Sequence, residues 1–264
     1  IANRTKGSIK WLDSEFLTPE ILDDTFAGVD GIIIPGGFGS RGTEGMILAA
    51  NYARENKIPF LGICLGMQMA MVAFARNVLG YEDANSSELN PDTTHPVVDL
   101  MPDQNGVENL GGTLRLGSYP CVLDKKSKAY SLYGTDMINE RHRHRFEINN
   151  DYRDDFTSHG MMLSGQSPDG HIVEMIELPD HPFYVGIQAH PEFKSRPNHA
   201  HPLFAGFVES AEEQGVLRRA KKLLMKRNHL SEPEAHRYLQ KTSMDTGRTM
   251  AESAHMVTML IQED

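Results

Sequence analysis

The segment from residue 59 to residue 76 most constrains what this chain can fold into. A short apolar run at 59–63 leads into the word Gly-Ile-Cys-Leu-Gly-Met-Gln at 62–68, and an apolar stretch rich in helix formers follows to residue 76. A run of this length is typical of a buried strand. A cysteine flanked by glycines between a strand and a helix predicts a sharp turn that presents the side chain at the head of the helix.

Cys64 at this turn has a candidate base and a candidate orienting acid in the word Gln-Ala-His-Pro-Glu at 188–192. A helix N-terminus favours the thiolate form of a cysteine. His190 can then act as the base, and Glu192 can orient its imidazole. A single cysteine is also a common core residue, and an isolated His-x-Glu word indicates little. The conjunction of the two words favours a catalytic site.

Strands and helices alternate in the first hundred residues. We expect helices at 18–26, 45–55 and 65–79, and strands at 31–35, 59–63 and 96–100. Mostly antiparallel strands follow at 119–123, 143–148, 161–167, 171–178 and 183–188. This order predicts an α/β fold with an open, mostly parallel, flavodoxin-like sheet and helices on both faces. Catalytic loops then lie at the carboxyl ends of the strands.

The Arg-His repeat at 141–145 divides its side chains between the two sides of a strand. His142 and His144 fall on one side, and the three arginines fall on the other. Neither a cysteine nor an acid completes a metal geometry around the two histidines, so we expect no metal site.

Further words give the chain a resemblance to a known family. Over residues 8–210 it resembles the class I (triad) glutamine amidotransferases, and among them the glutaminase domain of the CTP synthase family. The words that carry the resemblance stand at 35–45, 62–68, 85–88, 95–98, 111–117, 140–147, 190–193 and 201–204. The Arg-His repeat and the word Gly-Gly-Thr-Leu-Arg-Leu-Gly at 111–117 separate CTP synthases from their amidotransferase relatives.

The resemblance implies a role for each matching residue. Cys64 would be the nucleophile, His190 the general base and acid, and Glu192 the orienting carboxylate. The oxyanion hole would be the backbone N–H groups of Gly37 and Leu65, and a residue without Cβ at 37 allows a close approach of substrate. The residues implied to bind the substrate glutamine are Gly36, Gln68, Glu88 and Arg145. Without the resemblance, Glu88 would be a solvated loop acid and Arg145 a surface charge.

The implied reaction is hydrolysis of L-glutamine to glutamate and ammonia through a γ-glutamyl thioester, a step that needs no cofactor. In the family, a separate synthetase domain uses the ammonia with ATP, Mg²⁺ and UTP, under regulation by GTP, so that domain is the expected partner. The chain departs from the family at its front. Residues 9–15 match the second strand, and we expect an N-terminally truncated domain with an unpaired sheet edge.

Residues 212–264 differ in character from residues 1–211. An apolar stripe at 216–224 and capping boxes at 231–234 and 249–252 predict three amphipathic helices. Nine basic and eight acidic residues give this segment a net charge of +1, which leaves −11 for residues 1–211. Such asymmetry indicates two domains, a glutaminase domain at 1–211 and a small helical bundle at 212–264.

The words at 220–225, 231–235, 243–245 and 250–254 resemble the ANTAR domain, an RNA-binding antiterminator module, over residues 215–262. The resemblance implies binding to paired RNA stem-loops, usually as a dimer. The basic residues that could contact phosphates are Lys221, Lys222, Lys226, Arg227, Arg237, Lys241 and Arg248. The alternative is a dimerisation bundle whose lysines are merely solvated.

Composition narrows the class of protein. The 264 residues allow a sizeable core, two cysteines need no disulfide framework, and neither a signal peptide nor a long apolar run occurs. We therefore expect a cytoplasmic homo-oligomer with no membrane partner. The net charge of −10 argues against nucleic-acid affinity of the whole chain. Three hypotheses remain: a glutamine-hydrolysing enzyme, an RNA-binding antitermination regulator with the α/β part as scaffold or sensor, and an inert fragment.

Overall fold

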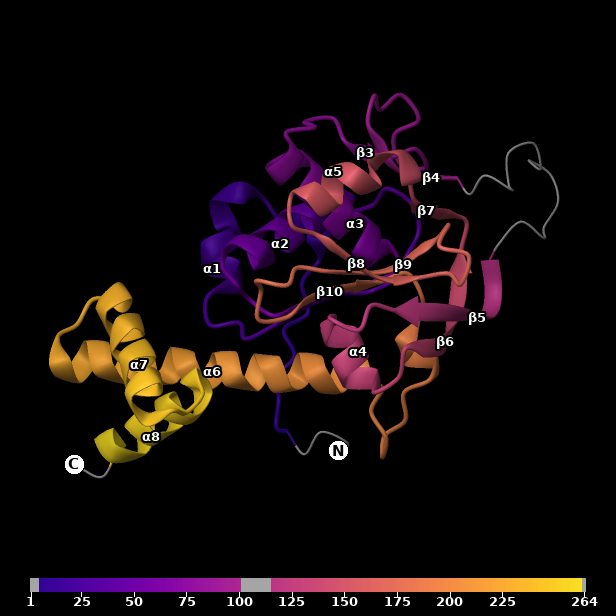
Figure 1. Cartoon of the computed structure of the whole chain (residues 1–264). Helices are drawn as coiled ribbons and strands as arrows, with labels where there is room; N and C mark the ends of the chain where they lie inside the picture. The colour runs from indigo at the N-terminus through magenta and orange to yellow at the C-terminus, as the bar shows by residue number, and fades with distance from the viewer. Residues whose placement is uncertain (1–4, 101–114, 263–264) are drawn as a thin grey trace.

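A seven-stranded sheet forms the centre of the computed structural model, which describes residues 5–100 and 115–262 (Figure 1). Its strands lie in the order β1-β2-β10-β9-β8-β5-β6, and a second sheet has the order β3-β4-β7. The strands are β1 Ile32–Ile34, β2 Phe60–Ile63, β3 Asn85–Ser86, β4 Pro96–Leu100, β5 Arg115–Leu123, β6 Met137–His144, β7 Phe146–Ile148, β8 Met162–Gln166, β9 Val173–Glu177 and β10 Tyr184–Ile187.

Helices cover both faces of the large sheet. The helices of the described residues are α1 Leu22–Phe26, α2 Thr43–Glu55, α3 Leu65–Phe74, α4 Lys128–Tyr133, α5 Arg153–Ser158, α6 Pro202–Asn228, α7 Glu232–Thr246 and α8 Met250–Gln262, of which α7 and α8 lie away from the sheet. On strand β2, Phe60 belongs to the core cluster that contains α2 and α3. Leu61 and Ile63 belong to a second core cluster, on the other face of the sheet, which also contains residues of α4 and α6. The alternation of a strand's side chains thus places the turn after β2 between two layers of helices.

The expected α/β class is confirmed, but the sheet is mixed rather than mostly parallel. Strand β2 pairs in parallel with β1 and β10, and the pairs from β10 through β9, β8 and β5 to β6 are antiparallel. The antiparallel part consists mainly of strands that follow one another in the chain, because short connections join antiparallel neighbours. The parallel part contains the turn at Cys64.

Three local expectations were wrong. The strand expected at 143–148 is two strands in different sheets, β6 and β7, which separate at Arg145. Residues 9–13 form no strand, and Trp11 is 87% exposed. The middle residue of β1, Ile33, is exposed rather than buried. In the described part of the chain, β1 pairs only with β2, so residues 9–13 do not pair with the open edge of β1.

The last three helices form the expected bundle. Its core consists of Ala220, Leu224, Ala235, Leu239, Ala254 and Val257. Ser231 and Glu234 make the expected capping box, and Thr249 and Glu252 make the other. The first helix of the bundle is the distal half of α6, which is continuous from Pro202 to Asn228 (Figure 1). The domain boundary expected between 211 and 212 therefore lies inside one helix.

Among the residues described, no helix combines the length and the apolar character needed to cross a membrane. Of the Gly-Gly-Thr-Leu-Arg-Leu-Gly motif at 111–117, residues 111–114 lie outside the described residues, and the structure describes it from Arg115 onward.

Candidate active site

The turn between β2 and α3 has the geometry of a nucleophile elbow. Cys64 has φ 50° and ψ −105°, a backbone conformation that non-glycine residues rarely adopt. Its N–H donates to Ile187 O at 2.7 Å, which ties the turn to β10. A Cβ on Gly66 would lie 2.1 Å from Ile34 O, so only glycine fits beneath the turn. The strained cysteine is thus fixed between β1, β10 and the first turn of α3.

The side chains of Cys64, His190 and Glu192 come together at this elbow. His190 Nδ1 lies 2.6 Å from Glu192 Oε1, and its imidazole also hydrogen-bonds Cys64. The backbone N–H of His190 donates to Arg141 O at 2.7 Å, so β6 holds the histidine in place. The hydrogen bonds with Cys64 and Glu192 raise the pKa of His190 to about 9. This arrangement favours the imidazolium form of His190 at neutral pH.

The glycine loop after β1 lies against the same site. A Cβ on Gly36 would lie 2.7 Å from His190 Cε1 and 3.4 Å from Cys64 Cβ. A Cβ on Gly37 would lie 3.3 Å from the Leu65 side chain. Leu65 is the first residue of α3, where helix N–H groups have no partner within the helix. The structure therefore brings Gly36 beside Cys64 and Gly37 beside Leu65, the residue that follows the cysteine; the oxyanion hole itself stays a prediction.

The residues expected to bind glutamine surround the elbow at different depths. Gln68 is buried, and its Nε2 donates to Phe146 O at 2.9 Å and to Gln188 Oε1 at 3.2 Å. Arg145 lies where β6 and β7 separate, and its charge acts on the carboxyl of Glu88. Partial burial raises the pKa of Glu88, and the charge of Arg145 opposes that rise. A positive and a negative group thus lie close enough to interact, and their role in binding an amino acid stays a prediction.

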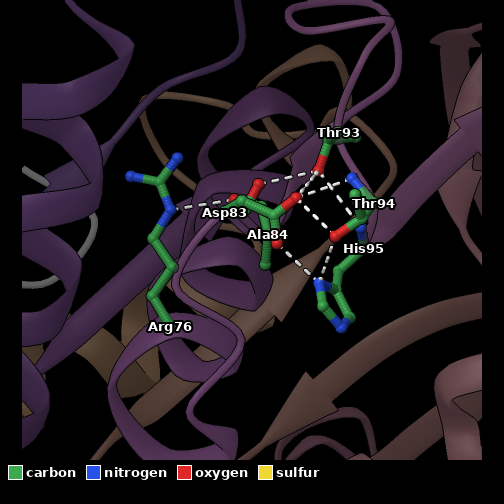
Figure 2. A network of polar contacts seen from close by, with 6 residues as sticks. All are labelled: Arg76, Asp83, Ala84, Thr93, Thr94 and His95. Atoms are coloured by element: carbon green, nitrogen blue, oxygen red, sulfur yellow. Dashed lines mark hydrogen bonds and ion pairs between the residues drawn. The ribbon is translucent and has the colours of Figure 1, made fainter.

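A polar network closes the loop that carries Glu88 (Figure 2). Asp83 Oδ1 lies 2.5 Å from His95 Nδ1, and Asp83 Oδ2 accepts from Thr94 N at 2.6 Å and from Thr94 Oγ1 at 2.7 Å. These bonds hold the pKa of Asp83 well below its usual range. Arg76 Nε donates to Ala84 O at 2.8 Å and ties the loop to the end of the helix after Cys64. Sequence reasoning missed this network, because its partners are polar loop residues without periodicity.

Charged and neutral polar side chains are buried below the site on β5, β6 and β9. Arg115 and Glu174 form an ion pair at 2.5 Å, and His142 Nδ1 lies 3.0 Å from His144 Nε2. Burial lowers the pKa of His142 to about 2 and of His144 to about 3, so both imidazoles are neutral. The predicted division of the Arg-His repeat is confirmed, since the histidines are buried and Arg141 and Arg143 are exposed.

The basic residues expected to bind RNA lie on the helical bundle. Lys222 and Lys226 are exposed one turn apart on α6, and Arg237 and Lys241 are exposed one turn apart on α7. Lys221 pairs with Glu232. Arg227 is exposed, and Arg248 Nη1 lies 3.0 Å from Met256 Sδ.

Comparison with known proteins gives two family matches. Residues 3–210 match the family "Glutamine amidotransferase class-I", and residues 207–257 match the ANTAR domain. The glutaminase domain of Trypanosoma brucei CTPS with bound acivicin has a similar structure, with a TM-score of 0.76 and 35% identity over 80% of this chain and 83% of that one.

Curated relatives named CTP synthase are also similar. The protein from Clostridium beijerinckii is 56% identical over 81% of this chain, and that from Clostridium kluyveri is 57% identical over 80%. The match covers 40% and 39% of those proteins, so the chain spans about two fifths of their length.

Proposed function

The chain belongs to the class I glutamine amidotransferase family, and on that basis we propose that it hydrolyses glutamine to glutamate and ammonia at Cys64. The observation that carries the proposal is the position of His190, which hydrogen-bonds both the sulfur at the elbow and the carboxylate of Glu192. A nucleophile, a base and an orienting acid in this order are the components of acyl transfer through a covalent intermediate.

The proposed first step is attack of the Cys64 thiolate on the side-chain amide carbon of glutamine. A carbon–sulfur bond forms, and the carbonyl oxygen gains negative charge. The backbone N–H groups of Leu65 and Gly37 stabilise that charge. His190 gives its proton to the amide nitrogen, the carbon–nitrogen bond breaks, and ammonia leaves.

The second step consumes the thioester. His190, now neutral, takes a proton from water, and the hydroxide attacks the thioester carbon. The carbon–sulfur bond breaks, glutamate leaves, and the imidazolium and thiolate are restored. One glutamine and one water thus give one glutamate and one ammonia. These steps use the side chains and backbone of the chain and draw on no cofactor.

The pocket residues supply selectivity for an α-amino acid. In the proposed mode, Glu88 binds the α-ammonium group and Arg145 binds the α-carboxylate, because each is opposite in charge to its partner. Gln68 Oε1 accepts from the α-ammonium group while its Nε2 holds Phe146 O and Gln188 Oε1. Gly36 leaves room for the substrate between the loop and His190.

We propose that the ammonia serves amination of UTP to CTP. The support is the similarity to proteins named CTP synthase, of which this chain spans about two fifths. The amination then needs a synthetase domain as partner, with ATP, Mg²⁺ and UTP at that domain and GTP as a regulator.

Glutamate release by the purified chain tests the enzyme proposal. We expect Cys64→Ala to abolish release and Cys121→Ala to retain it, because Cys121 is a buried core residue of strand β5 and burial raises the pKa of its thiol. A glutamine-like diazo-ketone should add once, at Cys64, with protection by free glutamine. Equal activity of the Cys64→Ala variant and the parent chain would refute the proposal.

A second proposed function is binding of structured RNA by the bundle. It is supported by the match of residues 207–257 to the ANTAR domain and by two exposed pairs of cations, one pair on α6 and one on α7. Side chains four residues apart lie on one face of a helix, so each pair presents two charges together. Such pairs suit two neighbouring phosphates of an RNA backbone.

Retention of RNA hairpins at increasing salt tests this second proposal. Charge reversal by Lys222→Glu with Lys226→Glu should weaken binding and lower the salt dependence, because fewer counterions are then released. The same change at Lys125 and Lys126, two exposed lysines of the glutaminase part, is the matched control. Equal loss in both double variants would contradict a binding site on the bundle.

A further inference from the structure

Gln188 is a buried amide that the proposed mechanism does not use. It follows β10 directly, has 0% of its surface exposed, and stands two residues before His190. Its Nε2 donates to Cys64 Sγ at 3.6 Å. Its own backbone N–H donates to Glu174 O at 2.8 Å, which fixes its position against β9. The side chain therefore reaches the sulfur from a rigid part of the sheet.

The direction of this amide is determined by its neighbours. A backbone carbonyl can only accept, so Phe146 O requires the NH₂ group of Gln68, which lies 2.9 Å away. The same Nε2 donates to Gln188 Oε1 at 3.2 Å. Because Gln188 Oε1 is the acceptor in that bond, its NH₂ group is the part that faces Cys64. A chain of donors thus runs from Gln68 through Gln188 to the sulfur.

We propose that Gln188 holds the Cys64 sulfur in place and favours its thiolate form by donating this N–H···S hydrogen bond. The inference rests on the proposed role of Cys64 as nucleophile. A donor stabilises an anion more than a neutral thiol, so the bond strengthens when the proton leaves. The sulfur is then held from two sides, by His190 from the loop after β10 and by Gln188 from the end of β10.

The other titratable and charged groups near the site are paired with partners other than the sulfur. Glu192 faces His190 rather than the sulfur. On β6, His142 and His144 are neutral imidazoles bonded to each other, and Arg115 on β5 is paired with Glu174 on β9. The donor from Gln188 is uncharged, so removing it changes the sulfur's environment without changing the charge of the site.

The pH dependence of Cys64 alkylation by iodoacetamide, followed by intact mass on the full chain, tests the proposal. In Gln188→Met, which keeps the length of the side chain but has no donor, the midpoint of the rate–pH profile should rise by about one pH unit. In Gln188→Glu it should rise further, because a carboxylate opposes a thiolate. Gln166→Met is the matched control, since Gln166 lies on β8 and binds Arg153; its midpoint should not move.

An unchanged midpoint in a folded Gln188→Met variant would overturn the proposal. If that variant does not fold, Gln68→Met removes the partner that orients Gln188, and a smaller rise in the midpoint is expected. No rise in Gln68→Met would then overturn the proposal as well. Alkylation does not require catalytic turnover, so it tests Gln188 separately from the proposed hydrolysis. If the midpoint shifts in a chain that releases no glutamate, the role of Gln188 is supported and the proposed hydrolysis is refuted.

Discussion

The guanidinium of Arg218 lies 2.7 Å from the carboxylate of Asp30, an ion pair between residues 188 positions apart. It joins α6 to the loop before β1. Each side chain of the pair lies against a glycine near its partner, since a Cβ on Gly215 would lie 3.1 Å from Asp30 Oδ1 and one on Gly28 would lie 2.7 Å from Arg218 Nη1. Helix α6 is therefore held against the α/β part at Arg218 as well as at its first turns.

Arg218→Ala should destabilise the chain only slightly. The side chains of Arg218 and Asp30 are 31% and 36% exposed, and partly exposed ion pairs contribute about 1 kcal/mol or less. Urea unfolding of Arg218→Ala, Asp30→Asn and the double variant measures the coupling free energy directly. Arg219→Ala, an exposed neighbour on the same helix, is the control. A coupling above about 3 kcal/mol would instead indicate a desolvated pair.

The raised pKa of His190 predicts the alkaline side of the activity profile. Because its pKa is about 9 in the folded chain, the imidazolium proposed to protonate the amide nitrogen of glutamine persists up to that pH. Its contribution to folding stability is fully present below the unfolded pKa of about 6.5 and is lost as pH rises through about 9. We expect kcat/KM to fall above about pH 9.

Glu192→Gln should move that fall to lower pH. The carboxylate is one of the two groups that raise the pKa of His190, and removing its charge destabilises the imidazolium. The loss of an oriented base should also lower kcat/KM at neutral pH by about a hundredfold. Glutamate release between pH 6 and 10 measures both effects, with Glu209→Gln as an exposed control. A profile identical to that of the parent chain would exclude Glu192 from the triad.

Asp83→Asn should raise KM for glutamine more than it lowers kcat. The network around Asp83 closes the loop that bears Glu88, and it does not touch the sulfur. Loosening that loop misplaces the group proposed to bind the α-ammonium, at a cost of about tenfold in KM. Asp92→Asn makes the same change in the same loop, outside the network of Figure 2, and should leave KM unchanged. A loss confined to kcat would contradict this role.

Gly66→Ala should disrupt the elbow. The added methyl group would lie 2.1 Å from Ile34 O, so β1 or α3 must shift, at a cost of about 2 kcal/mol or more. Gly7→Ala is the matched control, because a Cβ there meets nothing within 4 Å. Thermal unfolding measures whether the variant still folds, and diazo-ketone labelling of Cys64 measures whether the site is still formed. Full stability with full labelling of Gly66→Ala would show that the elbow can relax.

The elbow and the helices around it could be predicted from sequence because their signals are local. An apolar run, two glycines and a helix-forming stretch lie within about twenty residues, and the capping boxes of α7 and α8 span four residues each. The separation of β6 from β7 at Arg145 was not predictable in this way, because it depends on which strands each half joins across the molecule.

The contacts of Gln188 and Asp83 were missed for a related reason. Both are polar side chains whose partners lie far apart in sequence or in an irregular loop, so periodicity carries no information about them. The continuity of α6 was missed because the difference in charge between residues 1–211 and 212–264 suggested a boundary. Within the helix, Gly215 permits the close approach of Asp30.

Because α6 is unbroken, the number of residues in it determines how α7 and α8 are rotated about the helix axis relative to the α/β part. Each residue of an α-helix turns the chain by about 100° and advances it by about 1.5 Å. One residue inserted between Phe207, which packs with the α/β part, and Val216, which packs against the bundle core, would therefore rotate α7 and α8 by about a quarter turn around the helix axis. An insertion of seven residues would restore the azimuth to within about 20° and displace the bundle by about 10 Å. The side of the molecule from which the cations on α6 and α7 face the solvent is thus set by the phase of one helix.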